Sequence, residues 1–238
     1  MNADRRVRLW HRVVEHAQGG PATVAHVCAA AQAAAHVDGA AVTVMVGATG
    51  RETVYATDEI AARLAELTLT LGEGPGLPGV ELALVADLTA PDCLVRWPMF
   101  APAAVSAGAG AVFALPLQVG GAHVGVLDLY RAAPGGLVGE RLADALVLAD
   151  SACALLLDAA QRDGPPPDGR GPEPATLAHP EVHQATGMIT VQLGVTAAVA
   201  LIRLRAYAYA HDRRLRDVAG DVVARRLRFD PEPDGHER

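Results

Sequence analysis

Apolar residues recur at helical spacing in several stretches of the first two thirds of the chain. Residues 5–17 and 22–36 each predict a helix near the N-terminus. A third pattern covers residues 59–71, and Asp58 directly before it is a residue type that commonly caps a helix. Residues 139–160 predict a long apolar helix.

Between these helices the pattern changes to short runs rich in β-branched and aliphatic residues, which is typical of strands. Two runs flank Gly120-Gly121, which predicts a β-hairpin. The expected strands are residues 41–46, 53–56, 82–86, 111–119 and 123–130. Strands that end in a hairpin and are bracketed by helices predict an α+β fold, an antiparallel sheet flanked by helices.

The C-terminal part of the chain predicts three more helices, which would form a small bundle. The first covers residues 179–192 and ends at Gly194, the second begins after a Thr196 cap, and the third covers about residues 214–228. The second helix carries one apolar stripe, made of Val199, Ile202, Ala206 and Tyr209.

A segment rich in proline and glycine separates the two parts. Residues 163–174 contain five prolines and three glycines, a composition that disfavours both helix and central strand. We therefore expect a domain over residues 1–162, a linker over residues 163–178, a helical domain over residues 179–229 and an acidic tail over residues 230–238.

Charge divides at the same place. Residues 1–162 carry 10 arginines and 16 acidic residues, whereas residues 179–229 carry 8 arginines and 4 acidic residues. The chain has a net charge of −7 and no lysine, so its overall acidity conceals a basic module of net charge +4. A local basic surface matters more for polyanion binding than the total charge does.

Composition argues against several classes of protein. A hydrophobic fraction of 51% with 20% charged residues is typical of a folded chain. The three cysteines form no CxxC pair, and no apolar signal-peptide core follows the N-terminus, so we expect a cytoplasmic protein. The uncharged stretch from Trp97 to Leu127 is interrupted by proline and glycine, so we expect a helix and two buried strands there and no membrane span. No nucleophile–base pair or metal-ligand spacing occurs, so we expect no enzyme, no cofactor and no metal.

Four motifs of the N-terminal domain resemble a GAF domain over about residues 20–160. They are Val37-Asp38-Gly39-Ala40, the segment from Leu71 to Gly76, Asp87, and the hairpin from Leu115 to Tyr130. The resemblance implies a sensory α/β fold that often holds a small-molecule ligand. The cyclic-nucleotide signature needs a lysine, and no cysteine stands in a bilin-attachment motif, so the ligand stays unknown.

The C-terminal helices resemble ANTAR, the RNA-binding domain of transcription antiterminators. The resemblance covers about residues 179–229 and rests on residues 182–189, 201–208 and 215–223. It implies a dimer that binds hairpin loops in nascent RNA. The family usually has Ala-Lys-Gly where this chain has Ala185-Thr186-Gly187.

Arginine suits an RNA surface, because it binds phosphate bidentately and stacks on bases. Gly187 in mid-helix is unfavourable, so it predicts close approach by another helix or by a nucleotide. Arg203 and Arg205 cannot both face the same way on one helix. The candidate RNA-binding residues are Gln184, Ala185, Thr186, Gly187, Met188, Arg203, Arg205, Arg214 and Arg216.

Together these patterns predict an RNA-binding antitermination regulator, a homodimer in which a GAF sensor domain controls an ANTAR output domain. Two alternatives stay open. A basic three-helix bundle can be a DNA-binding helix-turn-helix. Thr186 in place of lysine favours a signalling or dimerisation protein that has lost RNA binding.

Overall fold

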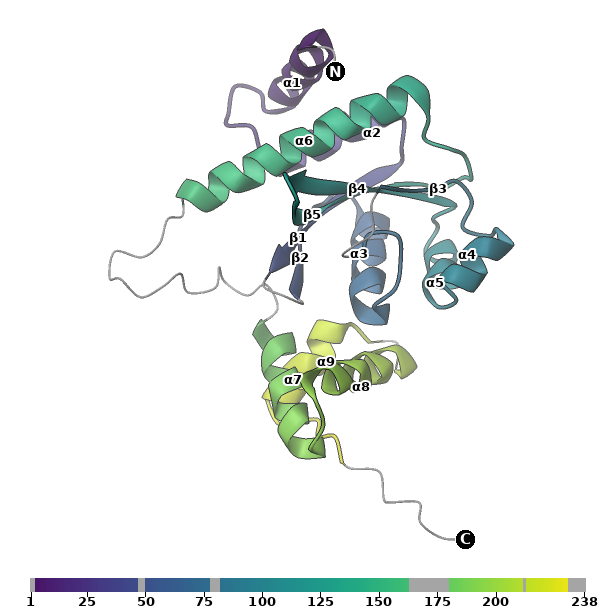
Figure 1. Cartoon of the computed structure of the whole chain (residues 1–238), viewed down its shortest axis with the longest axis vertical. Coiled ribbons are helices and arrows are strands. Elements are labelled where there is room, and N and C mark those ends of the chain that lie inside the picture. The colour runs from purple at the N-terminus through teal and green to yellow at the C-terminus, as the bar shows by residue number, and fades with distance from the viewer. Residues whose placement is uncertain (1–2, 47–49, 78–81, 163–179, 212, 231–238) are drawn as a thin grey trace.

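The computed structural model describes residues 3–46, 50–77, 82–162, 180–211 and 213–230. They form a sheet domain, which ends at Arg162, and a C-terminal bundle of three helices that begins at Pro180 (Figure 1). The predicted linker, and all but the first residue of the predicted acidic tail, lie outside the described residues.

The sheet domain is built on five strands in the order β2-β1-β5-β4-β3, with every neighbouring pair antiparallel. The strands are β1 Gly39–Val46, β2 Gly50–Ala56, β3 Ala83–Val85, β4 Ala111–Val119 and β5 Ala122–Arg131. β4 and β5 pair along their whole length about the Gly120-Gly121 turn. The predicted hairpin and the predicted α+β fold with an antiparallel sheet are confirmed.

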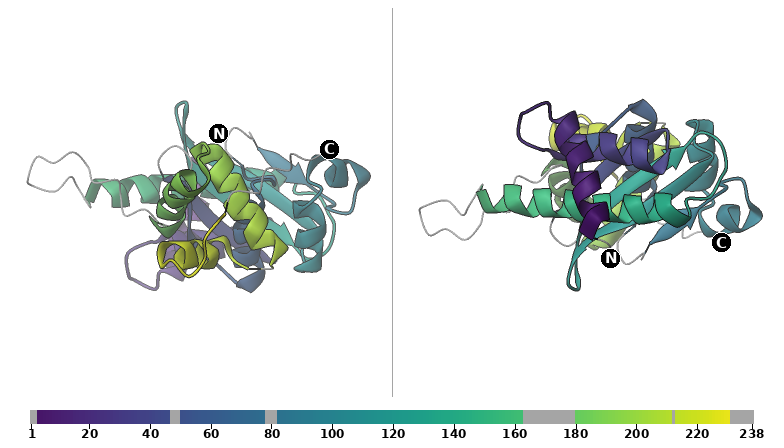
Figure 2. Two further views of the ribbon diagram at one scale, coloured as in Figure 1. Left: turned by 90° about the horizontal axis from the view of Figure 1, so that it is seen from below. Right: turned by 90° about the horizontal axis from the view of Figure 1, so that it is seen from above.

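Helices cover both faces of the sheet (Figures 1 and 2). One face carries α1 Ala3–His16, α2 Val24–Ala35 and α6 Gly139–Arg162, and the other carries α3 Glu59–Leu71, α4 Pro91–Arg96 and α5 Phe100–Ser106. Side chains alternate along β5, so Leu127 and Leu129 pack under α2 and α6 whereas Tyr130 packs with α3. Asp128 therefore points to the α3 face.

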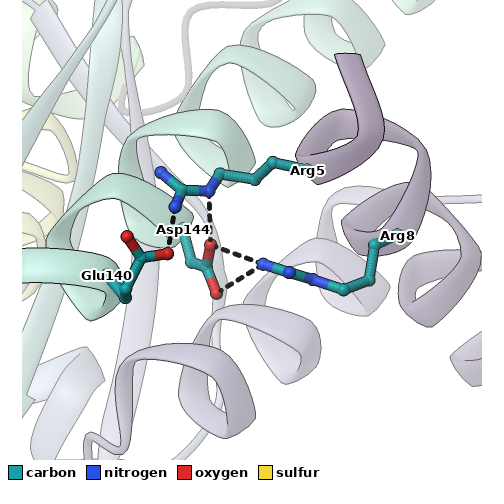
Figure 3. A network of polar contacts seen from close by, with 4 residues as sticks. All are labelled: Arg5, Arg8, Glu140 and Asp144. Atoms are coloured by element: carbon teal, nitrogen blue, oxygen red, sulfur yellow. Dashed lines mark hydrogen bonds and ion pairs between the residues drawn. The ribbon is translucent and has the colours of Figure 1, made fainter. Parts of the chain in front are cut away.

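Ion pairs hold α1 on the outer side of α6 (Figure 3). Arg5 pairs with Glu140 and with Asp144, the latter at 3.2 Å, and Arg8 reaches the same Asp144 at 3.0 Å. Asp144 is mostly buried, so its pairs with Arg5 and Arg8 are less screened than those on an open surface.

The predicted helix caps are confirmed. Asp58 accepts a hydrogen bond from the Ala61 amide at 2.9 Å at the start of α3. Thr196 accepts one from the Val199 amide at 3.4 Å at the start of the second helix of the bundle. Gly194 ends the first with φ of +65°, a conformation that favours glycine.

The uncharged stretch that begins at Trp97 folds as predicted, as α5 followed by the two strands of the hairpin. In the described part of the chain no single helix is long and apolar enough to cross a membrane. One pair of helices, Glu181–Leu193 with Ala197–Ala210, satisfies that test by length and composition, but the pair is bent by 106°.

The C-terminal bundle consists of α7 Pro180–Leu193, α8 Ala197–Ala210 and α9 Leu215–Val223. The third helix is shorter than predicted, because the chain turns at Arg225, which has φ of +58°. All three helices contribute to one core, made of Val182, Ala185, Ile189, Ala200, Leu204, Ala208, Leu215, Val218, Ala219 and Val222.

The apolar stripe predicted for the second helix of the bundle faces away from this core. Val199, Ile202 and Tyr209 are 38%, 62% and 49% exposed, and Ala206 is exposed as well. The buried stripe of α8 is Ala200, Leu204 and Ala208. Because α8 has apolar residues on both sides, spacing alone did not distinguish the two faces.

Candidate nucleic-acid interface

Two of the candidate residues on α7 lie on an open face of the bundle. Gln184 and Gly187 are exposed, and Val191 one turn further is 83% exposed. A Cβ added to Gly187 would meet nothing within 4 Å among the described residues. No helix in the described part of this chain therefore approaches Gly187 closely.

The other three candidates on α7 turn inward. Ala185 is fully buried in the core, which removes it from any surface. Thr186 is half-buried and its hydroxyl donates to the Val182 carbonyl at 2.7 Å. Met188 is half-buried against the core. Sequence spacing placed all five residues in one segment, but a helix turns only part of that segment outward.

Two arginines of the bundle are occupied by a carboxylate. Asp221 on α9 binds Arg213 at 2.7 Å and Arg226 at 2.7 Å, so it joins the chain just before α9 to the chain just after it. These hydrogen bonds hold the pKa of Asp221 below its usual range. The sequence offered both arginines as part of a possible RNA face, and the structure gives each a structural partner in Asp221.

Three of the four candidate arginines lie where the bundle meets the sheet domain. Arg205 on α8 is half-buried, and its Nη1 lies 2.5 Å from the position of a Cβ on Gly72, the residue that ends α3. Arg214 and Arg216 line a cleft of about 490 Å³ together with Glu59 and Glu66 of α3. Arg203, the fourth candidate, is exposed on α8. The candidates thus do not form one continuous open face.

The contact between the two domains is made by α3. Leu69 of α3 packs against the core of the C-terminal bundle. Glu66 accepts a hydrogen bond from the Leu215 amide at 3.2 Å, at the first residue of α9. In Figure 1 α3 stands between the sheet and the bundle. The sequence contains no local pattern that predicts this contact, because it joins residues far apart in the chain.

A half-buried pair of opposite charges lies on the α3 face of the sheet. Arg51 of β2 and Asp128 of β5 line a cavity of about 10 Å³, which is at the limit for a single water. Burial raises the pKa of Asp128 to about 6, while the charge of Arg51 opposes that rise. Two larger hollows, of about 470 and 490 Å³, lie between α3 and the C-terminal bundle.

The acidic residues of the GAF-like motifs support the backbone around them. Asp38 accepts from the Ala132 amide at 2.8 Å. Glu73 accepts from the Met99 and Phe100 amides at 2.6 and 2.5 Å, at the start of α5. Asp87 accepts a hydrogen bond from the Thr89 amide at 2.8 Å, within its own loop. These motifs therefore fix the fold of the sheet domain.

The described residues contain no group of three or more His, Cys, Asp or Glu side chains that could hold a metal ion.

The ANTAR domain model matches residues 175–223, which include all three helices of the bundle. The resemblance of the C-terminal part to ANTAR is thereby confirmed. No curated protein matches the chain.

Solved structures resemble the sheet domain only distantly. A domain assigned to a two-component sensor histidine kinase of Sinorhizobium meliloti 1021 is 19% identical, with a TM-score of 0.48 over 58% of this chain and 91% of that one. The GAF domain of a phosphoenolpyruvate-protein phosphotransferase from Coxiella burnetii is 12% identical, with a TM-score of 0.43 over 68% of this chain and 99% of that one. The GAF domain of the phosphoenolpyruvate-protein phosphotransferase from Acinetobacter is 11% identical, with a TM-score of 0.45 over 68% of this chain and 99% of that one.

Proposed function

We propose that the chain is an RNA-binding transcription antitermination regulator, with the C-terminal bundle as its output domain and the sheet domain as its sensor. The observation that carries this proposal is the ANTAR match on a bundle whose segment has a net charge of +4. Neutralising phosphates supplies most of the affinity for RNA, and exposed loop bases supply specificity.

The RNA surface that we propose combines the open face of α7 with the arginines of α8 and α9. Gln184 places an exposed amide on this face, and Gly187, which has no side chain, leaves room beside it for a loop base. Arg203 is exposed, and Arg205, Arg214 and Arg216 stand at the edge of the bundle nearest the sheet domain. Ala185 contributes only to the packing of α7.

A pair of isosteric substitutions tests this surface. Gln184→Glu places a negative charge on the open face of α7, and Gln118→Glu makes the same change at an exposed position of the β4–β5 hairpin. We expect filter binding to hairpin RNA to weaken about tenfold for Gln184→Glu, equivalent to about 1.4 kcal/mol, and to stay unchanged for Gln118→Glu.

The same assay separates the alternatives. Tight binding to duplex DNA with no preference for hairpin RNA would favour the DNA-binding regulator. Binding to neither nucleic acid would favour a signalling or dimerisation protein. The proposal stands only if hairpin RNA binds more tightly than single-stranded RNA and duplex DNA, with affinity that falls steeply as salt rises.

We also propose that the chain is a homodimer. The outer stripe of α8, from Val199 to Tyr209, is apolar and exposed in the single chain, and a surface of this kind commonly meets a partner. Equilibrium sedimentation at micromolar concentration tests this. A purely monomeric protein, with and without hairpin RNA, would contradict it.

A further inference from the structure

In the contact between α3 and the bundle, each of two helix ends meets a charge of opposite sign to its dipole. The N-terminus of α9 meets Glu66, and the C-terminus of α3 meets Arg205. Arg214 precedes α9, but its side chain makes no capping hydrogen bond in the described structure. Glu66 of the sheet domain takes that place, since its carboxylate accepts from the Leu215 amide at 3.2 Å. A carboxylate at a helix N-terminus is stabilised by the unpaired amides and by the helix dipole.

Arg205 completes the contact from the other side. Its guanidinium fills the space beside Gly72, at the C-terminal end of α3, where a positive charge is favourable. Glu66 lies within α3 and Gly72 caps its C-terminal end. The end of this one helix therefore contacts the cation Arg205 of α8, while its anion Glu66 binds the N-terminus of α9. Leu69 between them packs on the core of the bundle.

The docked arrangement also contains an unfavourable element. Burial and then the neighbouring charge of Arg51 lower the pKa of Arg205. The Nε atoms of Arg51 and Arg205 are buried and have no hydrogen-bond partner among the described residues. Two close guanidinium groups with unsatisfied donors make the contact weaker, and a phosphate would satisfy Arg205 better than the docked position does.

We propose that the α3 helix is a built-in competitor for RNA, which binds the arginine edge of the bundle and holds the full-length chain in an autoinhibited, docked state. This inference rests on the proposed RNA-binding function. Arg205, Arg214 and Arg216 face α3 or the cleft that Glu59 and Glu66 line. Docking half-buries the Arg205 guanidinium against α3, and Glu59 and Glu66 place negative charge near the exposed Arg214 and Arg216. RNA phosphates need the same guanidinium groups, so docking and RNA binding compete. A signal that alters the sheet domain near α3 then shifts the balance between them.

The test uses two substitutions of Glu66 in the full-length chain. Glu66→Gln removes the charge. Glu66→Asp keeps the net charge but withdraws the carboxylate from the Leu215 amide, so any gain in RNA affinity cannot come from altered overall charge. The matched control is Glu15→Gln on α1, which lies on the opposite side of the molecule from the bundle (Figure 1). Far-UV circular dichroism checks that every variant is folded.

If about nine tenths of the wild-type chains are docked, release raises the apparent affinity for hairpin RNA by about tenfold. We expect both Glu66 variants to show this gain and Glu15→Gln to bind like the wild type. A second readout needs no RNA: hydrogen exchange of the Leu215 amide should become faster in both Glu66 variants and not in the control.

Two results would overturn the inference in distinguishable ways. If all four proteins bind hairpin RNA equally and Leu215 exchanges at one rate, the competition is absent and the proposed function survives. If none of them binds any RNA, the proposed function fails, and the competition falls with it.

Discussion

At the residue scale, the sheet domain holds a half-buried carboxyl group beside an arginine. Asp128 lies in the middle of β5, on the face covered by α3, and Arg51 is the charge that acts on it. Arg51 also donates to the Gly76 carbonyl. Burying both ions costs solvation free energy that their attraction offsets only in part, which is why the pKa of Asp128 rises.

We expect Asp128 to make the sheet domain less stable as pH rises. The pKa is about 6 in the folded chain, above the value of about 4 for an unfolded aspartate. The stabilising contribution of Asp128 to the free energy of unfolding is complete below about pH 4. It is lost as pH rises through about 6, which lowers that free energy by about 1–3 kcal/mol. Urea unfolding at several pH values should show this loss in the wild type and not in Asp128→Asn.

The control for this measurement is Asp92→Asn, at an exposed position in the first turn of α4. It should leave the pH dependence as in the wild type. A wild-type unfolding free energy that rises with pH relative to Asp128→Asn would show that the pKa of Asp128 is lowered by Arg51 instead.

At the element scale, α8 shows where sequence patterns stop being sufficient. The caps at Asp58 and Thr196 and the turn at Gly120 are local features, and the sequence alone predicted them. The buried face of α8 is not local, because it depends on where α7 and α9 lie. With apolar residues on two sides of the helix, only the packed bundle distinguishes Leu204 from Ile202.

Two substitutions on α8 should therefore have very different effects. Leu204→Ala leaves a cavity at a fully buried position and should lower the free energy of unfolding of the bundle by about 2–4 kcal/mol. A loss of that size is enough to unfold a bundle with so small a core. Ile202→Ala, at a position 62% exposed, should change the unfolding free energy by less than about 0.5 kcal/mol in dilute, monomeric protein. Urea unfolding followed by far-UV circular dichroism measures both, and equal losses would mean that the outer stripe is the buried one.

At the scale of the whole molecule, the sequence predicted the division of charge but not the contact between the parts. The arginine-rich segment is visible from composition, and it coincides with the ANTAR match. The bond between Glu66 and the Leu215 amide joins positions separated by 149 residues, and no periodicity or cap motif relates them. The same holds for Arg205, whose surroundings exist only once the bundle is docked. Candidate residues could be named from the sequence, but which of them are open to RNA could not.

Two glycines provide a final test of the docked arrangement. Gly72 ends α3 and Gly194 ends α7, with φ of +66° and +65°, so an alanine at either position costs about 1 kcal/mol of backbone strain. Only at Gly72 would the new Cβ displace the flexible end of the Arg205 side chain from its docked position, since at Gly194 it meets nothing within 4 Å among the described residues. We expect small-angle X-ray scattering to show a larger radius of gyration for Gly72→Ala than for Gly194→Ala or the wild type. Because the two variants share the strain, expansion of Gly72→Ala alone would identify the Arg205 contact as a restraint on the bundle, and equal dimensions for all three proteins would show that it restrains nothing.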